Sequence, residues 1–212
     1  KLLCLENTHN LCFGAPIKSE YFDKIKTIVD ENNLKLHIDG ARIFNAAIAL
    51  NTTVKELAKN ADSITCCLSK GLSAPVGSLI MGDKKLIYKA HRIRKSLGGG
   101  MRQSGILAAA GIYSFDNMIN RLEQDHENAQ LLAKELSEID EIKIDLSTIN
   151  TNILFFNLQN TNIKDEELIN KFLNNNIKID SKGNRKFRIV THCGFEKKDI
   201  SAIINKIKKI LI

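Results

Sequence analysis

Residues 34–42, LKLHIDGAR, and residues 63–71, SITCCLSKG, decide the fold expected for this chain. Each is a short, largely apolar run that ends in a reactive side chain, Asp39 in the first and Lys70 in the second. A helical stretch separates the runs, so we expect them to be neighbouring parallel strands. Apolar strands that alternate with helices indicate an α/β fold, with a mostly parallel sheet covered by helices on both faces.

The same pattern extends around these two runs. Residues 2–6 and 76–81 read as further strands, and the second must be antiparallel to residues 63–68 because a parallel return needs a crossover. Helices are expected from Ser19 as N-cap, from Arg42 to Leu50, from Thr53 to Lys59, from Asp83 as cap to Leu97, and from about Ser104 to Ile139, with Gly105 and Gly111 as weak points.

Beyond the long helix the pattern becomes that of a compact α+β unit. Strands are expected at 142–144, 153–158, 177–179 and 187–192, and helices at 165–174 and 197–211. We therefore expect the remaining part of a large α/β domain over residues 1–138, including the long linking helix, and a small C-terminal α+β domain over residues 139–212.

Composition excludes several classes of protein. The net charge is +7, but the basic residues are spread over several expected helices and aromatic residues make up only 6%, so a nucleic-acid-binding protein is not expected. No apolar stretch reaches the roughly 20 residues of a membrane helix. The five cysteines are odd in number and sparse, which indicates a reduced, cytoplasmic protein. The chain starts at Lys1 in an apolar run, so we expect an N-terminal part to be missing.

Asp39 and Lys70 together have a defined chemical use. Pyridoxal phosphate (PLP) needs a lysine for a Schiff base and an acidic partner for its ring nitrogen, and ligands of open α/β sheets bind at the carboxyl ends of strands. Arg42, past the Gly40 turn, is expected near the same ring. The alternatives are an Asp39–Arg42 ion pair that closes the turn and a solvated lysine.

Cys66 and Cys67 are adjacent in a strand and face opposite ways, so no metal site is expected.

Five segments carry a family resemblance: residues 5–10, LENTHN; 36–45, LHIDGARIFN; 68–71, LSKG, with 75–78, PVGS; 98–105, GGGMRQSG; and 188–192, RIVTH, with Asn152. In this order they resemble the low-specificity L-threonine aldolases, which are fold-type-I PLP enzymes of the aspartate-aminotransferase-like superfamily. The resemblance covers essentially the whole chain. The N-terminal portion of the family, which carries the phosphate-binding loop and the ring that stacks on PLP, would precede Lys1.

The resemblance implies a role for seven residues. Lys70 would form the Schiff base with PLP, Asp39 would pair with the ring nitrogen, Arg42 would contact the phenolic oxygen and the substrate, Arg188 would bind the substrate carboxylate, His9 would face the substrate's β-hydroxyl, and Lys95 and Arg102 would reach a neighbouring subunit's phosphate. The implied assembly is a homodimer or homotetramer with shared active sites. The catalytic base stays open between His9 and a phosphate-bound water.

The implied activity is the retro-aldol cleavage of L-threonine or L-allo-threonine to glycine and acetaldehyde, a step of threonine catabolism and glycine biosynthesis. The substrate is a small amino acid, with no nucleic acid, membrane or metal expected. One alternative is a related PLP-dependent β-eliminating lyase or racemase. Another, from a different class, is a non-catalytic truncated remnant that binds a partner subunit.

Overall fold

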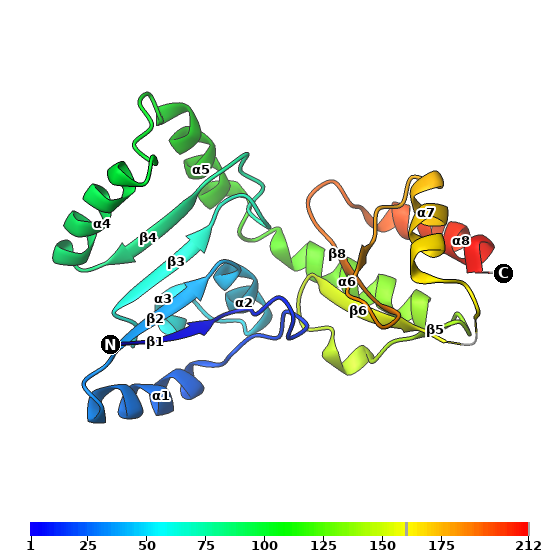
Figure 1. Cartoon of the computed structure of the whole chain (residues 1–212), viewed down its shortest axis with the longest axis horizontal. Coiled ribbons are helices and arrows are strands. Elements are labelled where there is room, and N and C mark those ends of the chain that lie inside the picture. Colours follow the sequence, from blue (N-terminus) through cyan, green and yellow to red (C-terminus); the bar gives the residue numbers. More distant parts are fainter. Residues whose placement is uncertain (160, 212) are drawn as a thin grey trace. The chain divides into compact units, whose positions relative to one another are not determined.

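The structure, a computed structural model, describes residues 1–159 and 161–211 (Figure 1). Two compact units make up the chain. Unit 1 comprises Lys1–His9 and Pro16–Leu122, and unit 2 comprises Asn10–Ala15 and Glu123–Ile212. The division therefore falls near residue 122 rather than at residue 138, and a short loop of the N-terminal region belongs to unit 2.

Unit 1 is built on a four-stranded sheet in the order β1 (Leu2–Glu6), β2 (Lys35–Gly40), β3 (Ser63–Cys67) and β4 (Ser78–Gly82). The first three strands are parallel, which confirms that the strands ending near Asp39 and Lys70 are neighbours. The last strand is antiparallel to β3, as the short loop requires.

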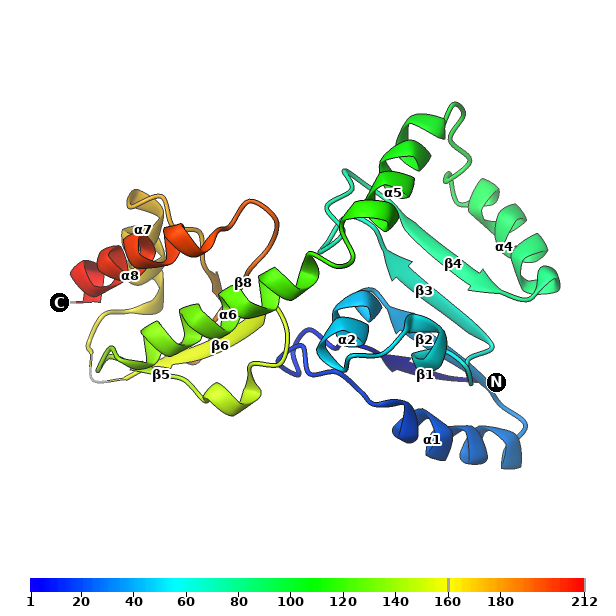
Figure 2. The same ribbon diagram turned by 180° about the vertical axis from the view of Figure 1, so that it is seen from behind.

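Helices cover one face of this sheet. They are α1 (Ser19–Glu31), α2 (Ile43–Ala49) and α3 (Val54–Leu57), and Figure 2 shows α2 and α3 in front of β2. The core beneath them includes Phe22, Ile38, Ile43, Leu57 and Ile64. Ser19 is the first residue of α1 and not its cap, since Lys18 holds the cap position without a side-chain bond.

The opposite face of the sheet is polar. Glu6, Asp39 and Thr65 are paired in register across β1, β2 and β3, and each is exposed or half-buried. The expectation of two covered faces is therefore met only in part over the residues that the structure describes. The physical reason is the alternation of polar and apolar residues in β2 and β3, since successive side chains of a strand point to opposite faces.

The prediction of one long helix from about Ser104 to Ile139 is wrong, because this region forms two helices. α5 (Gly105–Asn117) and α6 (Leu122–Ser137) are separated at Met118–Arg121, whereas Gly105 and Gly111 both lie inside α5. α4 (Lys84–Ser96) precedes them, and the carboxylate of Asp83 accepts a hydrogen bond from the Leu86 N–H at 2.7 Å, which confirms the expected cap.

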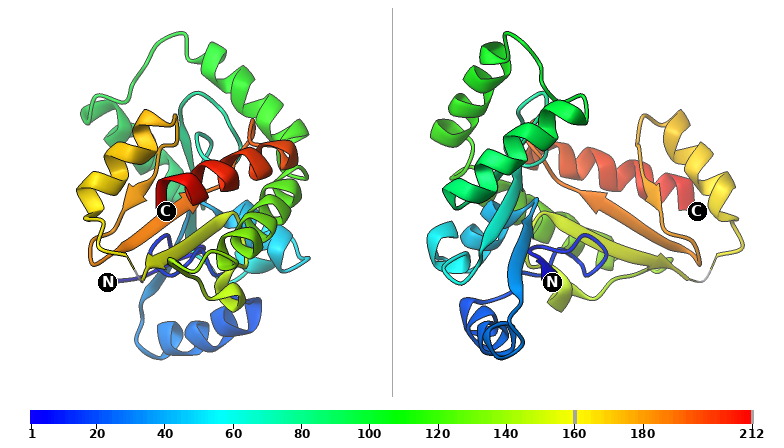
Figure 3. Two further views of the ribbon diagram at one scale, coloured as in Figure 1. Left: turned by 90° about the vertical axis from the view of Figure 1, so that its right-hand side faces the viewer. Right: turned by 60° about the vertical axis from the view of Figure 1, so that its left-hand side comes forward.

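Unit 2 has a second sheet, antiparallel throughout, in the order β5 (Ile142–Lys143), β6 (Ile153–Leu158), β8 (Lys186–Val190) and β7 (Asp180–Ser181). A 3₁₀ turn (Leu146–Thr148) follows β5. α6, α7 (Asp165–Asn174) and α8 (Lys197–Leu211) pack on one face, and Figure 3 shows α8 alongside β8. The expected strand at 177–179 is wrong: β7 begins at Asp180, because only Asp180 and Ser181 pair with β8.

The helices in the part of the chain that the structure describes are too short or too polar to cross a membrane.

Candidate functional site

The carboxyl ends of β2 and β3 present the two central residues of the predicted site. Asp39 is the last polar residue of β2, and its Oδ1 accepts a hydrogen bond from the Ala41 N–H at 3.0 Å. Lys70 follows β3 in a turn in which its carbonyl accepts from the Ser73 N–H at 2.9 Å. Both residues are exposed. The two side chains are therefore accessible at the same edge of the sheet.

Two glycines allow this arrangement. A Cβ on Gly40 would lie 2.6 Å from the carbonyl oxygen of Thr65, which is backbone and has little room to move. A Cβ on Gly71 would lie 2.7 Å from a methyl carbon of Leu122. Each reactive residue is thus followed by a glycine that permits close packing of the turn after it.

The loop after β1 lies beside Asp39. The N–H of Asn7 donates to the Asp39 carbonyl at 2.9 Å, and the side chain of Asn7 forms two 3.0 Å hydrogen bonds with the backbone of Ile17. Nε2 of His9 is 3.3 Å from a carboxylate oxygen of Glu6. Within the described residues, Nδ1 of His9 and Oγ1 of Thr8 are buried without a hydrogen-bond partner.

These observations fit a bound group such as PLP. An accessible amine and an accessible carboxylate lie at the ends of neighbouring parallel strands, where ligands of α/β sheets bind. Buried polar atoms without partners are uncommon, and those of Thr8 and His9 leave hydrogen-bonding capacity in the loop beside Asp39. The residues that would hold the group are Lys70, Asp39 and Arg42. The side chain of Arg42 is half-buried, and the residue directly precedes α2.

Arg188 belongs to unit 2, where it lies in β8 opposite Phe155 of β6 and Asp180 of β7. Its Nη1 donates to the side-chain oxygen of Asn10, and its Nη2 donates to Oδ2 of Asp180. Its Nε is buried and has no partner among the described residues. The guanidinium is therefore held by two side chains of its own unit, and its Nε is the nitrogen left without a partner among the described residues.

The two predicted interface residues lie apart from these groups along the chain. Lys95 is in the last turn of α4, and Arg102 is in the loop between α4 and α5. Both are exposed. In the basic stretch around Lys95, His91 and Arg94 lie within 3.0 Å of each other. The chain alone thus leaves both cations at the surface.

The remaining histidines differ from one another. Nδ1 of His37 lies 2.8 Å from the Ser63 hydroxyl, and the side chain is half-buried. His91 is exposed. His126, by contrast, is only 6% exposed, and burial lowers its pKa to about 4. The reason is that His126 lies on the side of α6 that packs into unit 2.

The cysteines give no sign of a metal centre. Cys66 is buried and Cys67 half-buried, consistent with opposite faces of β3, and burial raises the pKa of the Cys66 thiol. The described residues contain no group of His, Cys, Asp and Glu that could hold a metal ion.

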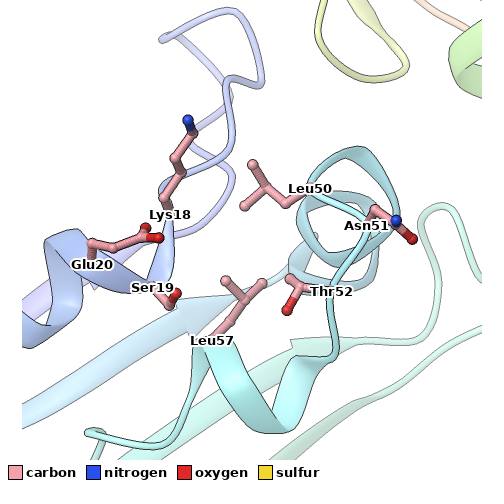
Figure 4. Close-up of a pocket in the computed structure, with 7 residues that line it drawn as sticks. All are labelled: Lys18, Ser19, Glu20, Leu50, Asn51, Thr52 and Leu57. Atoms are coloured by element: carbon pink, nitrogen blue, oxygen red, sulfur yellow. The ribbon is translucent and has the colours of Figure 1, made fainter.

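One cavity of unit 1 lies away from the predicted site. It has a volume of about 340 Å³ and is formed by the start of α1 and the α2–α3 connection, as Figure 4 shows. Its lining residues are Lys18, Ser19, Glu20, Leu50, Asn51, Thr52 and Leu57. None of the predicted site residues is among them, so the site is an open sheet edge rather than this cavity.

Sequence reasoning missed three polar partners of predicted site residues: Glu6 beside His9 in unit 1, and Asn10 and Asp180 beside Arg188 in unit 2. Glu6 could have been found, since it precedes His9 by three residues in a quoted motif. Asp180 could have been found from the short polar turn that joins β7 and β8. Asn10 carries no such signal, because its contact joins residues 178 positions apart.

Comparison with known proteins identifies the family. The chain is 40% identical over 211 residues to a probable low-specificity L-threonine aldolase 2 of Arabidopsis thaliana, covering 99% of this chain and 59% of the relative. It is 51% identical over 155 residues to the low specificity L-threonine aldolase of Escherichia coli strain K12, covering 73% of this chain and 45% of the relative. The chain thus spans about half the length of these curated relatives.

Solved structures share the fold. A putative L-allo-threonine aldolase of Listeria monocytogenes superposes with a TM-score of 0.82 at 16% identity, covering 98% of this chain and 61% of that one. A Leishmania major threonine aldolase gives a TM-score of 0.77 at 21% identity, covering 100% and 61%. The architecture thus matches part of a fold-type-I PLP enzyme. The Beta-eliminating lyase family profile matches residues 1–159, and the chain belongs to that family as a homologue of the low-specificity L-threonine aldolases.

Proposed function

We propose that the protein cleaves L-threonine or L-allo-threonine to glycine and acetaldehyde with PLP as cofactor. The observation that carries the proposal is the pair of Asp39 and Lys70 at the carboxyl ends of adjacent parallel strands in a chain homologous to threonine aldolases. When bound, PLP supplies a ring that accepts electrons as the Cα–Cβ bond of the substrate breaks.

The residues of the chain have separate tasks in this proposal. The amine of Lys70 holds the cofactor, and the carboxylate of Asp39 keeps a proton on its ring nitrogen. Arg42 contacts the phenolic oxygen. Arg188 binds the substrate carboxylate, for which a guanidinium provides paired donors in a fixed geometry.

His9 is the proposed base for the β-hydroxyl proton. Its Nε2 is beside the Glu6 carboxylate at 3.3 Å, which favours the tautomer with the proton on that nitrogen. The lone pair is then on Nδ1, the atom without a partner among the described residues. A nitrogen lone pair without a hydrogen-bond partner can accept a proton, as a general base must.

We further propose a cytoplasmic homodimer or homotetramer in which Lys95 and Arg102 complete a neighbouring subunit's phosphate site. The support is the exposure of both cations beside an apolar surface: Ile93, Leu97, Met101 and Ile106 are each more than half exposed. Exposed apolar clusters of this kind mark protein contacts.

The Lys70→Ala substitution tests the central assignment in the full-length protein. We expect the absorbance of lysine-bound PLP to disappear and the cleavage rate to fall by about 10³-fold or more. Thermal unfolding should be unchanged because Lys70 is exposed. Lys55→Ala, at an exposed lysine of α3 in the same unit, is the matched control and should retain both properties.

Product analysis separates the proposal from its nearest alternative. L-threonine, L-allo-threonine and L-serine are supplied in turn, and glycine with an aldehyde is the expected outcome for the first two. An oxo acid with ammonia would instead establish β-elimination, the reaction after which the family is named.

For the Lys70→Ala protein, unchanged absorbance of lysine-bound PLP and an unchanged cleavage rate would show that Lys70 does not hold the cofactor.

A further inference from the structure

Arg188 already contacts a carboxylate of its own unit. Asp180 lies directly opposite it in β7, and Oδ2 of Asp180 accepts from Nη2 of Arg188 at 2.5 Å. The Arg188 side chain is 19% exposed and that of Asp180 is 41% exposed. The protein thus supplies its own carboxylate at one edge of the guanidinium proposed to bind the carboxylate of the substrate.

Asp180 has a second cationic partner. Nζ of Lys182 is 2.7 Å from the same oxygen, Oδ2. Burial raises the pKa of Asp180, but the hydrogen bond from Lys182 and the charge of Arg188 outweigh burial and hold the pKa below its usual value. Asp180 therefore stays charged near neutral pH, and it keeps a partner when Arg188 turns away.

Arg185 shows what a purely structural guanidinium looks like in the same unit. Its three nitrogens donate to the backbone carbonyls of Leu158, Ile163 and Thr161 at 3.4, 3.1 and 2.9 Å. These acceptors are fixed by the fold. The acceptors of Arg188 are the side chains of Asn10 and Asp180, which can change rotamer, so only the contacts of Arg188 are exchangeable.

We propose that Asp180 is a positioning residue whose carboxylate competes with the substrate carboxylate for Arg188. When the substrate binds Arg188, Asp180 remains paired with Lys182 alone. The inference rests on the proposed function, which assigns Arg188 to the carboxylate. Binding then requires separation of the Asp180–Arg188 pair, which lowers affinity, while Lys182 reduces the cost of that separation.

Removal of the two charges should shift affinity in opposite directions. The test is the dissociation constant of glycine for the full-length, PLP-loaded protein, measured by isothermal titration calorimetry. Asp180→Asn should bind glycine about two- to five-fold more tightly, the range expected for a partly exposed ion pair. Lys182→Met should bind it more weakly by a similar factor, and the double variant should match Asp180→Asn because Lys182 acts through Asp180.

Two further variants control for general effects of charge. Asp180→Glu keeps the carboxylate and should restore affinity toward that of the natural protein. Lys171→Met removes a lysine of the same unit that pairs with Glu167 on α7, and it should leave the affinity unchanged. In steady-state kinetics, Asp180→Asn should lower KM for threonine with little change in kcat, a split that a loss of folding does not produce.

Arg188→Ala distinguishes this inference from the function on which it rests. That variant should weaken glycine binding by more than about tenfold. If it binds glycine normally, the role of Arg188 in the proposed function is wrong and the inference falls with it. If it loses binding while Asp180→Asn is neutral or weaker than the natural protein, or if the two single effects simply add in the double variant, the inference alone is overturned.

Discussion

The two units of the chain bury their apolar residues very differently. Unit 2 has one continuous core in which side chains of α6, α7 and α8 pack on β5, β6 and β8, and its members include Leu136, Phe156, Phe172, Phe187 and Ile207. In unit 1, every residue of β4 is exposed, α4 buries no side chain and α5 buries only Gly111 and Ser114.

This difference places most of the stabilising packing in unit 2 and the exposed candidate site residues Asp39 and Lys70 in unit 1. Burial of apolar surface is the main favourable term in folding, so unit 2 contains the packing that stabilises its own fold. Unit 1 has a covered face behind α1–α3 and an open polar face on which Asp39 lies, followed by Lys70 in the next turn. The covered face fixes the strands, and the open face leaves the reactive groups accessible.

The largest expected effect on stability is truncation in the core of unit 2. Phe187 is 0% exposed and stacks on Phe156 with ring centroids 5.6 Å apart. Phe187→Ala should lower the free energy of unfolding by about 3–5 kcal/mol, measured by urea denaturation. Tyr113→Ala on α5, where the side chain is 63% exposed, should change it by no more than about 0.5 kcal/mol. An equal loss at Tyr113 would mean that the α5 surface is buried in solution and would break the comparison.

A smaller effect is expected from pH at His126. Burial lowers the pKa of His126 to about 4 from 6.5, so between these values the unfolded chain binds a proton that the folded chain does not. Stability is therefore fully present above about pH 6.5 and decreases by about 3 kcal/mol as the pH falls to about 4. Urea denaturation over this range measures the slope. The His126→Gln substitution should flatten the slope of stability against pH. The control His91→Gln, at an exposed histidine of unit 1, should leave that slope unchanged. Equal slopes in both variants and the natural protein would contradict the prediction.

The smallest effect concerns the cap of α4. Because α4 buries no side chain, the hydrogen bond from the Leu86 N–H to Asp83 is a large part of what fixes its first turn. Asp83→Ala should destabilise this helix by about 1 kcal/mol, detected as faster hydrogen exchange of its amides. Lys85→Ala is the control in the same turn. Unchanged exchange in the Asp83→Ala protein would show that contacts beyond the chain hold α4 in place.

Most of the secondary structure could be predicted because its signals are local. β6, α7 and α8 match the predicted ranges, since each is a short run with clear periodicity. The antiparallel β4 followed from the length of one loop. The errors have non-local causes: the break at Met118–Arg121 carries no glycine or proline, and the position of β7 depends on which residues reach β8.

For the candidate site, the sequence by itself predicted which residues carry chemistry. It also determined that Asp39 and Lys70 lie at the carboxyl ends of neighbouring strands, because strand order follows from crossovers and loop lengths. Only the tertiary structure decided their surroundings: the open face of the sheet, the burial of His126, and the contacts of Arg188 with Asn10 and Asp180. The physical reason is that burial and hydrogen-bond partners depend on residues far away along the chain, which periodicity and spacing do not encode.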